Sequence, residues 1–115
     1  MLNKVIFIIL TCCLWGAVSG ASAEPGVASK DVERLFQEGK SLSDNSQHDE
    51  AFPLLREAAQ KGHGGAQAEL GWLYMVGKGA EKDMTEARKW FMESAKQNHP
   101  EGFYYMAWIY YTGIE

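Results

Sequence analysis

Few side chains in this chain are arranged in a way that supports metal binding. His63 and His99 lie 36 residues apart, and their neighbours include no cysteine and only one carboxylate, Glu101. A structural zinc site takes about four thiolate, imidazole or carboxylate ligands. His48 lies in a polar segment, residues 43–49, that lacks the central glycine and the terminal glutamate of a calcium-binding loop. We therefore expect no metal and no cofactor.

Catalytic motifs are also missing. The Gly-Lys-Gly segment at 77–79 lacks the spacing of a GxxxxGK[ST] phosphate loop and follows a helical pattern where that loop follows a strand. We interpret it as a turn. Neither G-x-S-x-G nor H-E-x-x-H occurs, and carboxylates such as Glu69 and Glu86 fall mostly on polar helix faces. The sequence predicts that the protein is not an enzyme.

The first 23 residues differ from the rest in composition. Lys4 precedes an almost wholly apolar run, residues 5–18, and a small-x-small pattern ends at Ala23. This pattern is typical of a secretory signal peptide that is cleaved after Ala23. The alternative is a membrane anchor, but the run is shorter than the ~20 residues of a spanning helix. We expect a periplasmic or secreted protein with no membrane span after cleavage.

Both cysteines, Cys12 and Cys13, lie in the apolar run, so cleavage leaves no disulfide to compensate for a thin core. Lipidation of a cysteine is an alternative, although the residues before Cys12 lack the small residue usual at a bacterial lipoprotein site. Residues 24–115 keep 10 of the 11 basic and all 15 acidic residues, which gives a net charge of −5. That balance argues against nucleic acid as a partner, because nucleic-acid binding needs a basic surface.

A shift of 36 residues aligns the chain with itself. Each unit predicts two helices. Apolar residues recur at helical spacing over 66–76, and Gly77 suits the left-handed turn that ends such a helix. Asp83 with Glu86 forms a capping-box pattern at the start of the next helix, and Pro100 opens the one after it. The coinciding residues include Ala51 and Ala87, Leu55 and Phe91, His63 and His99, Trp72 and Trp108, and Gly77 and Gly113.

An earlier helix pair precedes these units, over about 29–42 and 50–61. Pro53 falls early in the second of these helices, so that helix should begin late or bend there. No segment alternates with period two, so we expect an all-α fold: a short α-solenoid of antiparallel helix pairs with about five helices. The expected organisation is a signal peptide at 1–23, a linker at 24–28, and a repeat domain at 29–115. That domain comprises a pair at 29–62, a repeat at 63–98 and a partial repeat at 99–115.

Small residues mark where we expect neighbouring helices to cross closely. Gly39, Gly71 and Ala107 occupy equivalent positions in the first helix of each unit, and Ala59 and Ala95 are expected opposite them. A larger side chain at such a crossing would force the helices apart.

A motif runs through the second unit: Ala66-x-Ala68-x-Leu70-Gly71-x-Leu73-Tyr74-x-x-Gly77-x-Gly79, then Asp83, Ala87, Trp90-Phe91 and Ala95. It closely resembles the Sel1-like repeat, a relative of the tetratricopeptide repeats. The resemblance is strong over 50–113, while 29–50 is looser and more like a tetratricopeptide unit. Asn98 in place of a glycine and Ala107 in place of the helix glycine are departures from the pattern.

The resemblance implies an adaptor or scaffold role. Exported bacterial members of the family include envelope proteins, host-interaction factors and antidotes to secreted toxins. A cysteine-rich branch is linked to penicillin binding and β-lactam hydrolysis and uses disulfides within each repeat. That activity is not carried over, because residues 24–115 contain no cysteine.

In solenoids of this kind the first helix of each pair lines the concave surface. Three positions in each first helix share one face of it, and aromatic residues there favour binding of a protein or peptide partner. The alternative is that the two tryptophans of this face cover a neighbouring helix. The predicted partner-binding residues are Phe36, Lys40, Trp72, Met75, Tyr104, Trp108 and Tyr111.

The last predicted helix is unusually aromatic: six of the nine residues 103–111 are Phe, Tyr or Trp. No second helix is predicted to cover it, and repeat proteins need a polar cap at such an end. We expect a partner, a second copy in a homodimer, or a fold-back contact there. The sequence therefore predicts an exported protein–protein interaction module, either an adaptor or an inhibitor. The alternatives are a periplasmic immunity protein against a secreted toxin or enzyme, a self-assembling envelope protein and, least favoured, a cell-wall-related enzyme.

Overall fold

The described part of the chain consists of five helices and no strand. The computed structural model describes the backbone of residues 25–114 and the side chains of residues 30–114, so the expected signal peptide lies outside the described residues. The first helix begins inside the segment expected to be a linker. The helices are α2 (Pro25–Asp44), α3 (His48–Gln60), α4 (Gly64–Val76), α5 (Met84–Lys96) and α6 (Pro100–Thr112).

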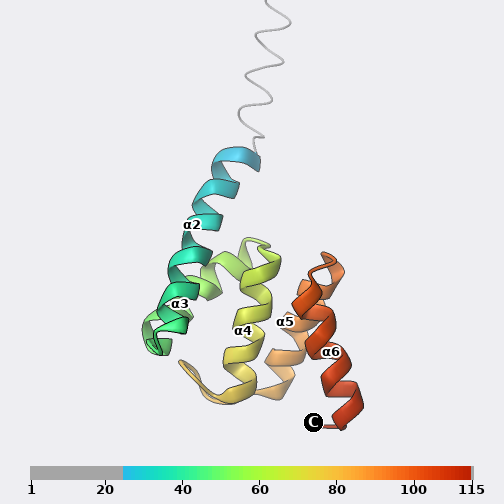
Figure 1. Ribbon diagram of the computed structural model, residues 1–115. Coiled ribbons are helices and arrows are strands. Elements are labelled where there is room, and N and C mark those ends of the chain that lie inside the picture. The colour runs from blue at the N-terminus through green and yellow to red at the C-terminus, as the bar shows by residue number, and fades with distance from the viewer. Residues whose placement is uncertain (1–24, 115) are drawn as a thin grey trace, which may run out of the picture. The chain divides into compact units, whose positions relative to one another are not determined.

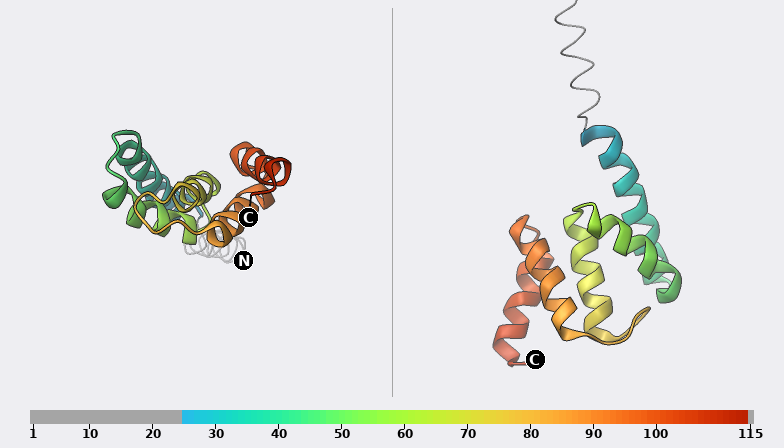
Figure 2. Two further views of the ribbon diagram at one scale, coloured as in Figure 1. Left: turned by 90° about the horizontal axis from the view of Figure 1, so that it is seen from below. Right: turned by 180° about the vertical axis from the view of Figure 1, so that it is seen from behind.

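The chain divides after Lys30, and the packing described here is that of the second unit, Asp31–Glu115. Successive helices run in opposite directions (Figure 1). Seen from below, α2, α4 and α6 form one row and α3 and α5 form the other (Figure 2). Helix α4 packs against α3 and α5, and α5 packs against α6. The predicted all-α solenoid of helix pairs is confirmed.

The turns between pairs repeat as the sequence does. Gly62 and Asn98, which are equivalent by the 36-residue shift, both have positive φ values, of 90° and 60°. Asparagine tolerates this left-handed conformation better than most residues. Pro100 is the first residue of α6, and Gly77 ends α4 with φ 72°, so both predicted helix boundaries are confirmed.

Helix α5 begins with half of the expected capping box. The Asp83 side chain accepts hydrogen bonds from the backbone N–H groups of Thr85 and Glu86, at 3.0 and 3.1 Å. The Asp83 N–H donates to the carbonyl of Tyr74 at 2.9 Å, where a full box would use the Glu86 side chain. The start of α5 is therefore tied to the end of α4.

Helix α3 begins earlier than expected. Its first residue is His48, and Pro53 lies inside it. Of the two expected outcomes, the late start is therefore wrong, and a bend at Pro53 stays a prediction. Proline removes one backbone donor. The side chain of Pro53 is exposed, and solvent can satisfy the carbonyl that loses its partner.

The core consists of two clusters that share α4. The first joins α3 to α4, with the buried part of α2 packed against it, and the second joins α5 to α6. Trp72 and Tyr74 contact both clusters. The fully buried residues of the first cluster are Ala51, Leu55, Ala58, Ala59, Ala66, Leu70 and Leu73, and those of the second are Ala87, Phe91 and Ile109.

Two of the predicted close crossings are confirmed, with different partners from those expected. A Cβ atom on Gly71 would lie 2.7 Å from the ring of Phe91, and one on Gly39 would lie 2.8 Å from Leu55. The large residues Phe91 and Leu55, and neither Ala59 nor Ala95, therefore fill the space that each glycine leaves.

The third predicted crossing is wrong. Ala107 is exposed, and no described helix crosses it. Helix α6 instead approaches α5 at Gly102, where a Cβ atom would lie 2.6 Å from the backbone nitrogen of Ala95.

Replacing Gly71 with leucine should destabilise the protein by ~1–3 kcal/mol, because the added side chain would overpack the contact with Phe91. Urea unfolding followed by circular dichroism measures the change. Ala107→Leu is the matched control, because it adds a similar volume at the equivalent exposed position and should shift the unfolding midpoint little. Equal effects of the two substitutions would contradict the Gly71–Phe91 contact.

Candidate functional site

The surface formed by α2, α4 and α6, here called the inner face, carries charges at its centre. Lys40 on α2 donates a hydrogen bond to Glu69 on α4 at 2.6 Å. The Glu69 side chain is 15% exposed and that of Lys40 is 38% exposed. The hydrogen bond to Glu69 raises the pKa of Lys40 above its usual value, and the charges of Glu69, Asp44 and Glu101 act in the same direction. The pair joins two helices that are distant in sequence.

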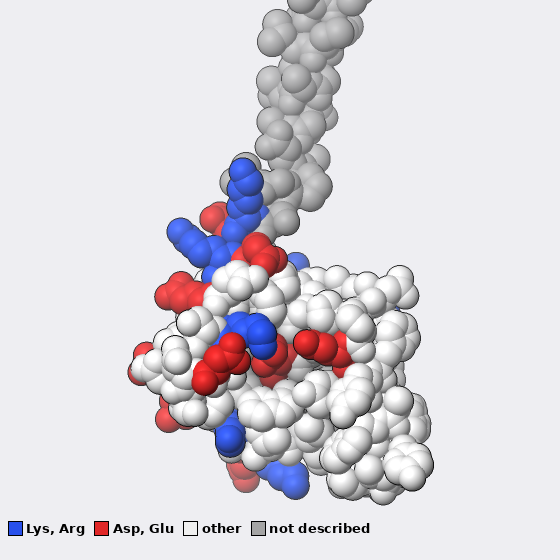
Figure 3. All heavy atoms as spheres, in the orientation of Figure 1, with Lys and Arg blue, Asp and Glu red and all other residues white. Residues whose placement is uncertain are grey.

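Figure 3 shows acidic and basic side chains gathered near the middle of this face, with a largely uncharged surface over α6 beside them. Two side chains of α6, Glu101 and Tyr105, interact electrostatically with that centre. Burial raises the pKa of Tyr105, and the charges of Glu69 and Glu101 raise it further. The ring of Tyr105 stacks on Phe91 with centroids 4.7 Å apart. This contact fixes α6 beside the charged centre.

Three aromatic residues on α6 project from the inner face. Tyr104, Trp108 and Tyr111 recur at i, i+4 and i+7, which places them on one side of the helix. They are 63%, 37% and 91% exposed. Tyr104 meets the edge of Tyr105 at a centroid distance of 5.2 Å. The face therefore offers rigid aromatic contacts next to carboxylates, an arrangement suited to binding another polypeptide.

The other predicted partner-binding residues are more involved in packing. Phe36 stacks on His63 at 4.3 Å and contacts the first core cluster. Trp72 contacts both clusters, with the Lys78 amino group 5.6 Å from its ring centre, and Met75 packs against the second cluster. Lys40 is engaged by Glu69. The structure thus brings Lys40 to the same face as the α6 aromatic residues, and leaves Phe36, Trp72 and Met75 half-buried.

Sequence reasoning missed the role of His63. Its Nδ1 accepts the Ala66 backbone N–H at 3.0 Å, so it caps the start of α4. Nε2 then carries the ring proton and donates to Glu33 on α2 at 2.8 Å. Hydrogen bonds from Gln37 and then from His63 lower the pKa of Glu33. Both nitrogens of His63 therefore serve the packing of α2 on α4.

The described residues show no constellation typical of an active site or metal centre. Among residues 30–114, no three His, Cys, Asp or Glu side chains cluster in a way that could hold a metal ion. None of the three histidines in that range is hydrogen-bonded to a serine or threonine hydroxyl. No helix in the described residues combines the length and apolar character that crossing a membrane requires.

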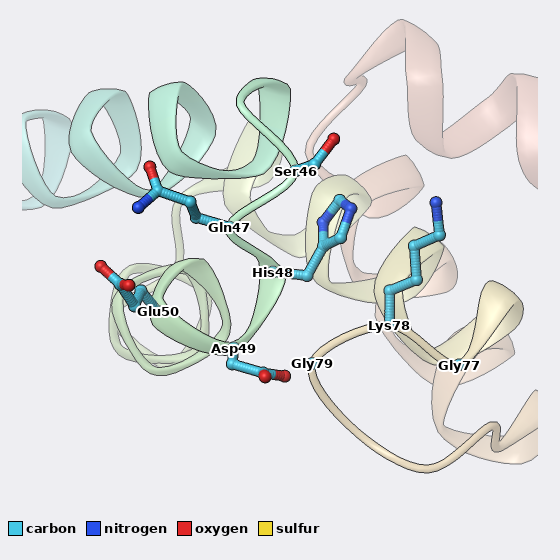
Figure 4. A pocket seen from close by; sticks show the side chains of 8 residues that line it. All are labelled: Ser46, Gln47, His48, Asp49, Glu50, Gly77, Lys78 and Gly79. Carbon is cyan, nitrogen blue, oxygen red and sulfur yellow. The ribbon is translucent and has the colours of Figure 1, made fainter.

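A hollow of about 390 Å³ lies between the turn that precedes α3 and the turn that follows α4. Figure 4 shows His48 and Lys78 side by side at its edge, with Asp49 facing Gly79. Acidic and basic residues are mixed along its wall. Asp49 also lies in the first turn of α3, where the helix dipole stabilises a carboxylate. The sequence indicated the turn at 77–79 but gave no sign that it meets the start of α3.

Comparisons with known proteins agree with the repeat geometry. The family model described as Sel1 repeat matches residues 34–63 and 65–99, more than half of the chain. The crystal structure of a Sel1 repeat protein from Oxalobacter formigenes superimposes with a TM-score of 0.67 at 27% identity, over 96% of this chain and 47% of that one.

Two curated proteins are similar over a part of their length. The ERAD-associated E3 ubiquitin-protein ligase component HRD3A of Arabidopsis thaliana is 30% identical over 76 residues, which are 65% of this chain and 11% of that protein. The exopolysaccharide production negative regulator of Rhizobium leguminosarum bv. viciae is 34% identical over 91 residues, which are 79% of this chain and 32% of that protein. The chain thus spans about a third or less of the length of either relative.

The Lys40–Glu69 pair should stabilise the fold by ~0.5–1 kcal/mol, since Lys40 is more than a third exposed and solvent screens the pair. A double-mutant cycle with Lys40→Met and Glu69→Gln measures this coupling by urea unfolding. Because the folded pKa of Lys40 is raised, the contribution should be complete at neutral pH. It should be lost as the pH rises through that folded pKa, above the ordinary lysine value of about 10.4.

The exposed pair formed by Glu57 on α3 and Lys61, the residue that follows α3, serves as the control for this cycle and should show weaker coupling. A Lys40–Glu69 coupling that persists unchanged at pH ~12, beyond the ordinary range of lysine ionisation, would contradict the assignment.

Proposed function

This chain belongs to the Sel1 repeat family, and on that premise we propose that it is an exported interaction module that binds a protein or peptide through its inner face. The observation that carries the proposal is the exposure of Tyr104, Trp108 and Tyr111 on one side of α6. Large aromatic side chains dominate the energy of protein interfaces, because they bury much area at little cost in conformational entropy. Their alignment beside a charged centre supports a binding surface.

The charges of the inner face favour a partner of defined character. Glu69 and Glu101 lie near Lys40, so carboxylates outnumber the cation at the centre. Residues 24–115 carry a net charge of −5. A partner segment with a basic residue between apolar contacts would be complementary to this face, and such complementarity increases specificity and association rate.

The relatives support a role in assembly or regulation. One is a component of a ubiquitin ligase and the other is a negative regulator of exopolysaccharide production. We infer that this chain acts in the same general way, as an adaptor or as an inhibitor that occupies the surface of another protein. An immunity protein that neutralises a secreted toxin or enzyme is one specific form of the inhibitor.

Export is part of the proposal and is supported by the sequence of residues 1–23 alone. The first residue of protein recovered from the cell envelope or the medium tests it. Glu24 is expected, whereas an uncleaved Met1 or a lipid-modified Cys12 would contradict cleavage after Ala23.

A second candidate function is self-assembly through α6. It is favoured by the number of large apolar side chains that this helix exposes, among them Phe103 and Tyr110. Sedimentation velocity across a wide concentration range separates the two candidates, since a homodimer or larger assembly would dissociate on dilution.

Removing two inner-face rings together, Tyr104→Ala and Tyr111→Ala, should weaken partner binding at least about tenfold, because interface hot spots exceed the ~1.4 kcal/mol that a tenfold change represents. The parent chain is tagged and used to capture partners from envelope and secreted fractions. The affinity of an identified partner is then measured for the parent and the variant.

Met92→Ala is the matched control, because Met92 is also an exposed apolar residue but lies on α5. It should leave the affinity unchanged. Equal affinity of the parent and the folded double variant would overturn the inner-face assignment.

A further inference from the structure

A second surface of α6, here called the outer face, is formed by Phe103, Ala107, Tyr110 and Ile114. We propose that the outer face binds an amphipathic helix of another polypeptide, docked on α6 as α5 is docked on α4. This goes beyond the proposed function, because its residues are distinct from Tyr104, Trp108 and Tyr111 of the inner face. Phe103, Ala107 and Tyr110 recur at i, i+4 and i+7, which is one stripe along the helix, and Ile114 follows Gly113, the residue that ends α6.

The 36-residue repeat indicates which kind of element would dock on the outer face. A shift of 36 residues places Phe103 on Gln67 and Ala107 on Gly71. On α4 these two positions are buried beneath α5: Gln67 accepts a hydrogen bond from Gln97 at 2.7 Å, and Gly71 lies under the ring of Phe91. The surface of α4 that α5 covers is therefore repeated on α6, where no described helix covers it.

The exposed side chains on that copy are apolar. Phe103 is 52% exposed and Tyr110 is 74% exposed, and Ile114 is also exposed. The position of Gln67, which makes a polar contact on α4, is occupied by phenylalanine on α6. A helix docked there would bury more apolar surface per residue than α5 does at this position.

A hollow of about 190 Å³ beside the outer face gives an independent sign of the same occupant. It is bounded by Arg88 of α5 and by Ile109, Tyr110 and Ile114. Arg88 is equivalent to Phe52, which in the preceding unit lies beneath the turn that leads into α5: a Cβ atom on Gly79 would be 3.0 Å from Phe52. The hollow thus corresponds to the space that, in the preceding unit, is filled by the turn that leads into α5. It could hold the extended segment that precedes a docked helix.

The side chain that the docked helix should carry follows from the difference between Gly71 on α4 and Ala107 on α6. Gly71 admits Phe91 because a Cβ atom there would lie only 2.7 Å from the ring. Ala107 carries that Cβ atom, so a phenylalanine cannot sit at the same depth on α6. The docked helix should instead carry a leucine or valine at this position, with a small residue one turn before it, as Ala87 precedes Phe91.

A second copy of this chain fits the outer face less well. At two glycine crossings a small residue on one helix meets a large one on the other, because Gly39 meets Leu55 and Gly71 meets Phe91, whereas Gly102 approaches the backbone of Ala95. Two α6 helices facing each other would oppose aromatic residues on both sides of Ala107. They would also leave the hollow beside Arg88 unfilled.

The test uses synthetic, fluorescently labelled peptides of residues 77–97, which contain the entering turn and α5. One peptide has the natural sequence and the other carries F91L. Fluorescence anisotropy measures their binding to protein purified after expression of the full chain. We expect saturable binding of both, with the F91L peptide at least about threefold tighter, a modest difference on the affinity scale.

Protein variants reverse or remove this preference. Ala107→Gly removes the Cβ atom and so leaves the space that Gly71 leaves for Phe91. The natural peptide should then be the tighter ligand. Ala107→Leu should weaken both peptides at least about tenfold. Tyr104→Ala changes the inner face, at the position equivalent to Ala68, which belongs to neither core cluster, and should leave both affinities unchanged. Circular dichroism confirms that each variant is folded.

Three outcomes would overturn the proposal. One is the absence of binding to both the parent chain and Ala107→Gly. Another is binding that Tyr104→Ala abolishes and Ala107→Leu spares, which would place the peptide on the inner face. The third is a dimer in sedimentation that Ala107→Leu dissociates and neither peptide competes with, which would make the outer face a self-interface. If the outer-face proposal fails, the inner-face proposal is unaffected, because it is tested separately by the partner affinity of the variant that lacks Tyr104 and Tyr111.

Discussion

The contact of Phe91 with Gly71 determines how the rest of the repeat packs. The phenylalanine is fully buried, and only a residue without a Cβ atom allows α5 to approach α4 this closely. The same ring also stacks on Tyr105, with the two ring centroids 4.7 Å apart. One side chain therefore sets the separation of α4 and α5 and the position of α6. If α5 moved outward, the aromatic residues of α6 would no longer lie beside Lys40 and Glu69.

Both proposed binding surfaces lie on helix α6, because only part of this helix is buried. Gly102 and Ile109 face α5 and are covered, while the inner and outer stripes stay open. The inner stripe adjoins carboxylates and suits a peptide with a basic residue. The outer stripe is apolar and repeats the surface of α4 to which α5 binds. On the two proposals, the two faces of this helix would bind partners of different chemistry, as an adaptor that holds two molecules together requires.

Much of the fold was predictable because it depends on local patterns. Helical periodicity located five helices, Gly77 and Pro100 marked helix ends, and the 36-residue repeat gave the pairing. Contacts between distant residues were not predictable: nothing near Glu69 indicated that it bonds to Lys40, 29 residues away. The position of Ala107 suggested a covered crossing, yet it is exposed, because whether a helix face is covered depends on elements beyond that helix. The half-burial of Trp72 has the same origin, since its neighbours come from both core clusters.

Solvent access along α6 tests the account most directly. Both native cysteines lie at positions 12 and 13, so a chain with these two replaced by serine can carry one new cysteine at Ile109, Tyr110 or Tyr111. The rate of alkylation then reports exposure at each position. We expect Tyr110→Cys and Tyr111→Cys to react as fast as the unfolded chain, and Ile109→Cys to be protected. Protection of positions 110 and 111 in the isolated protein would show that both faces are already covered, and would contradict the claim that α6 is open for binding.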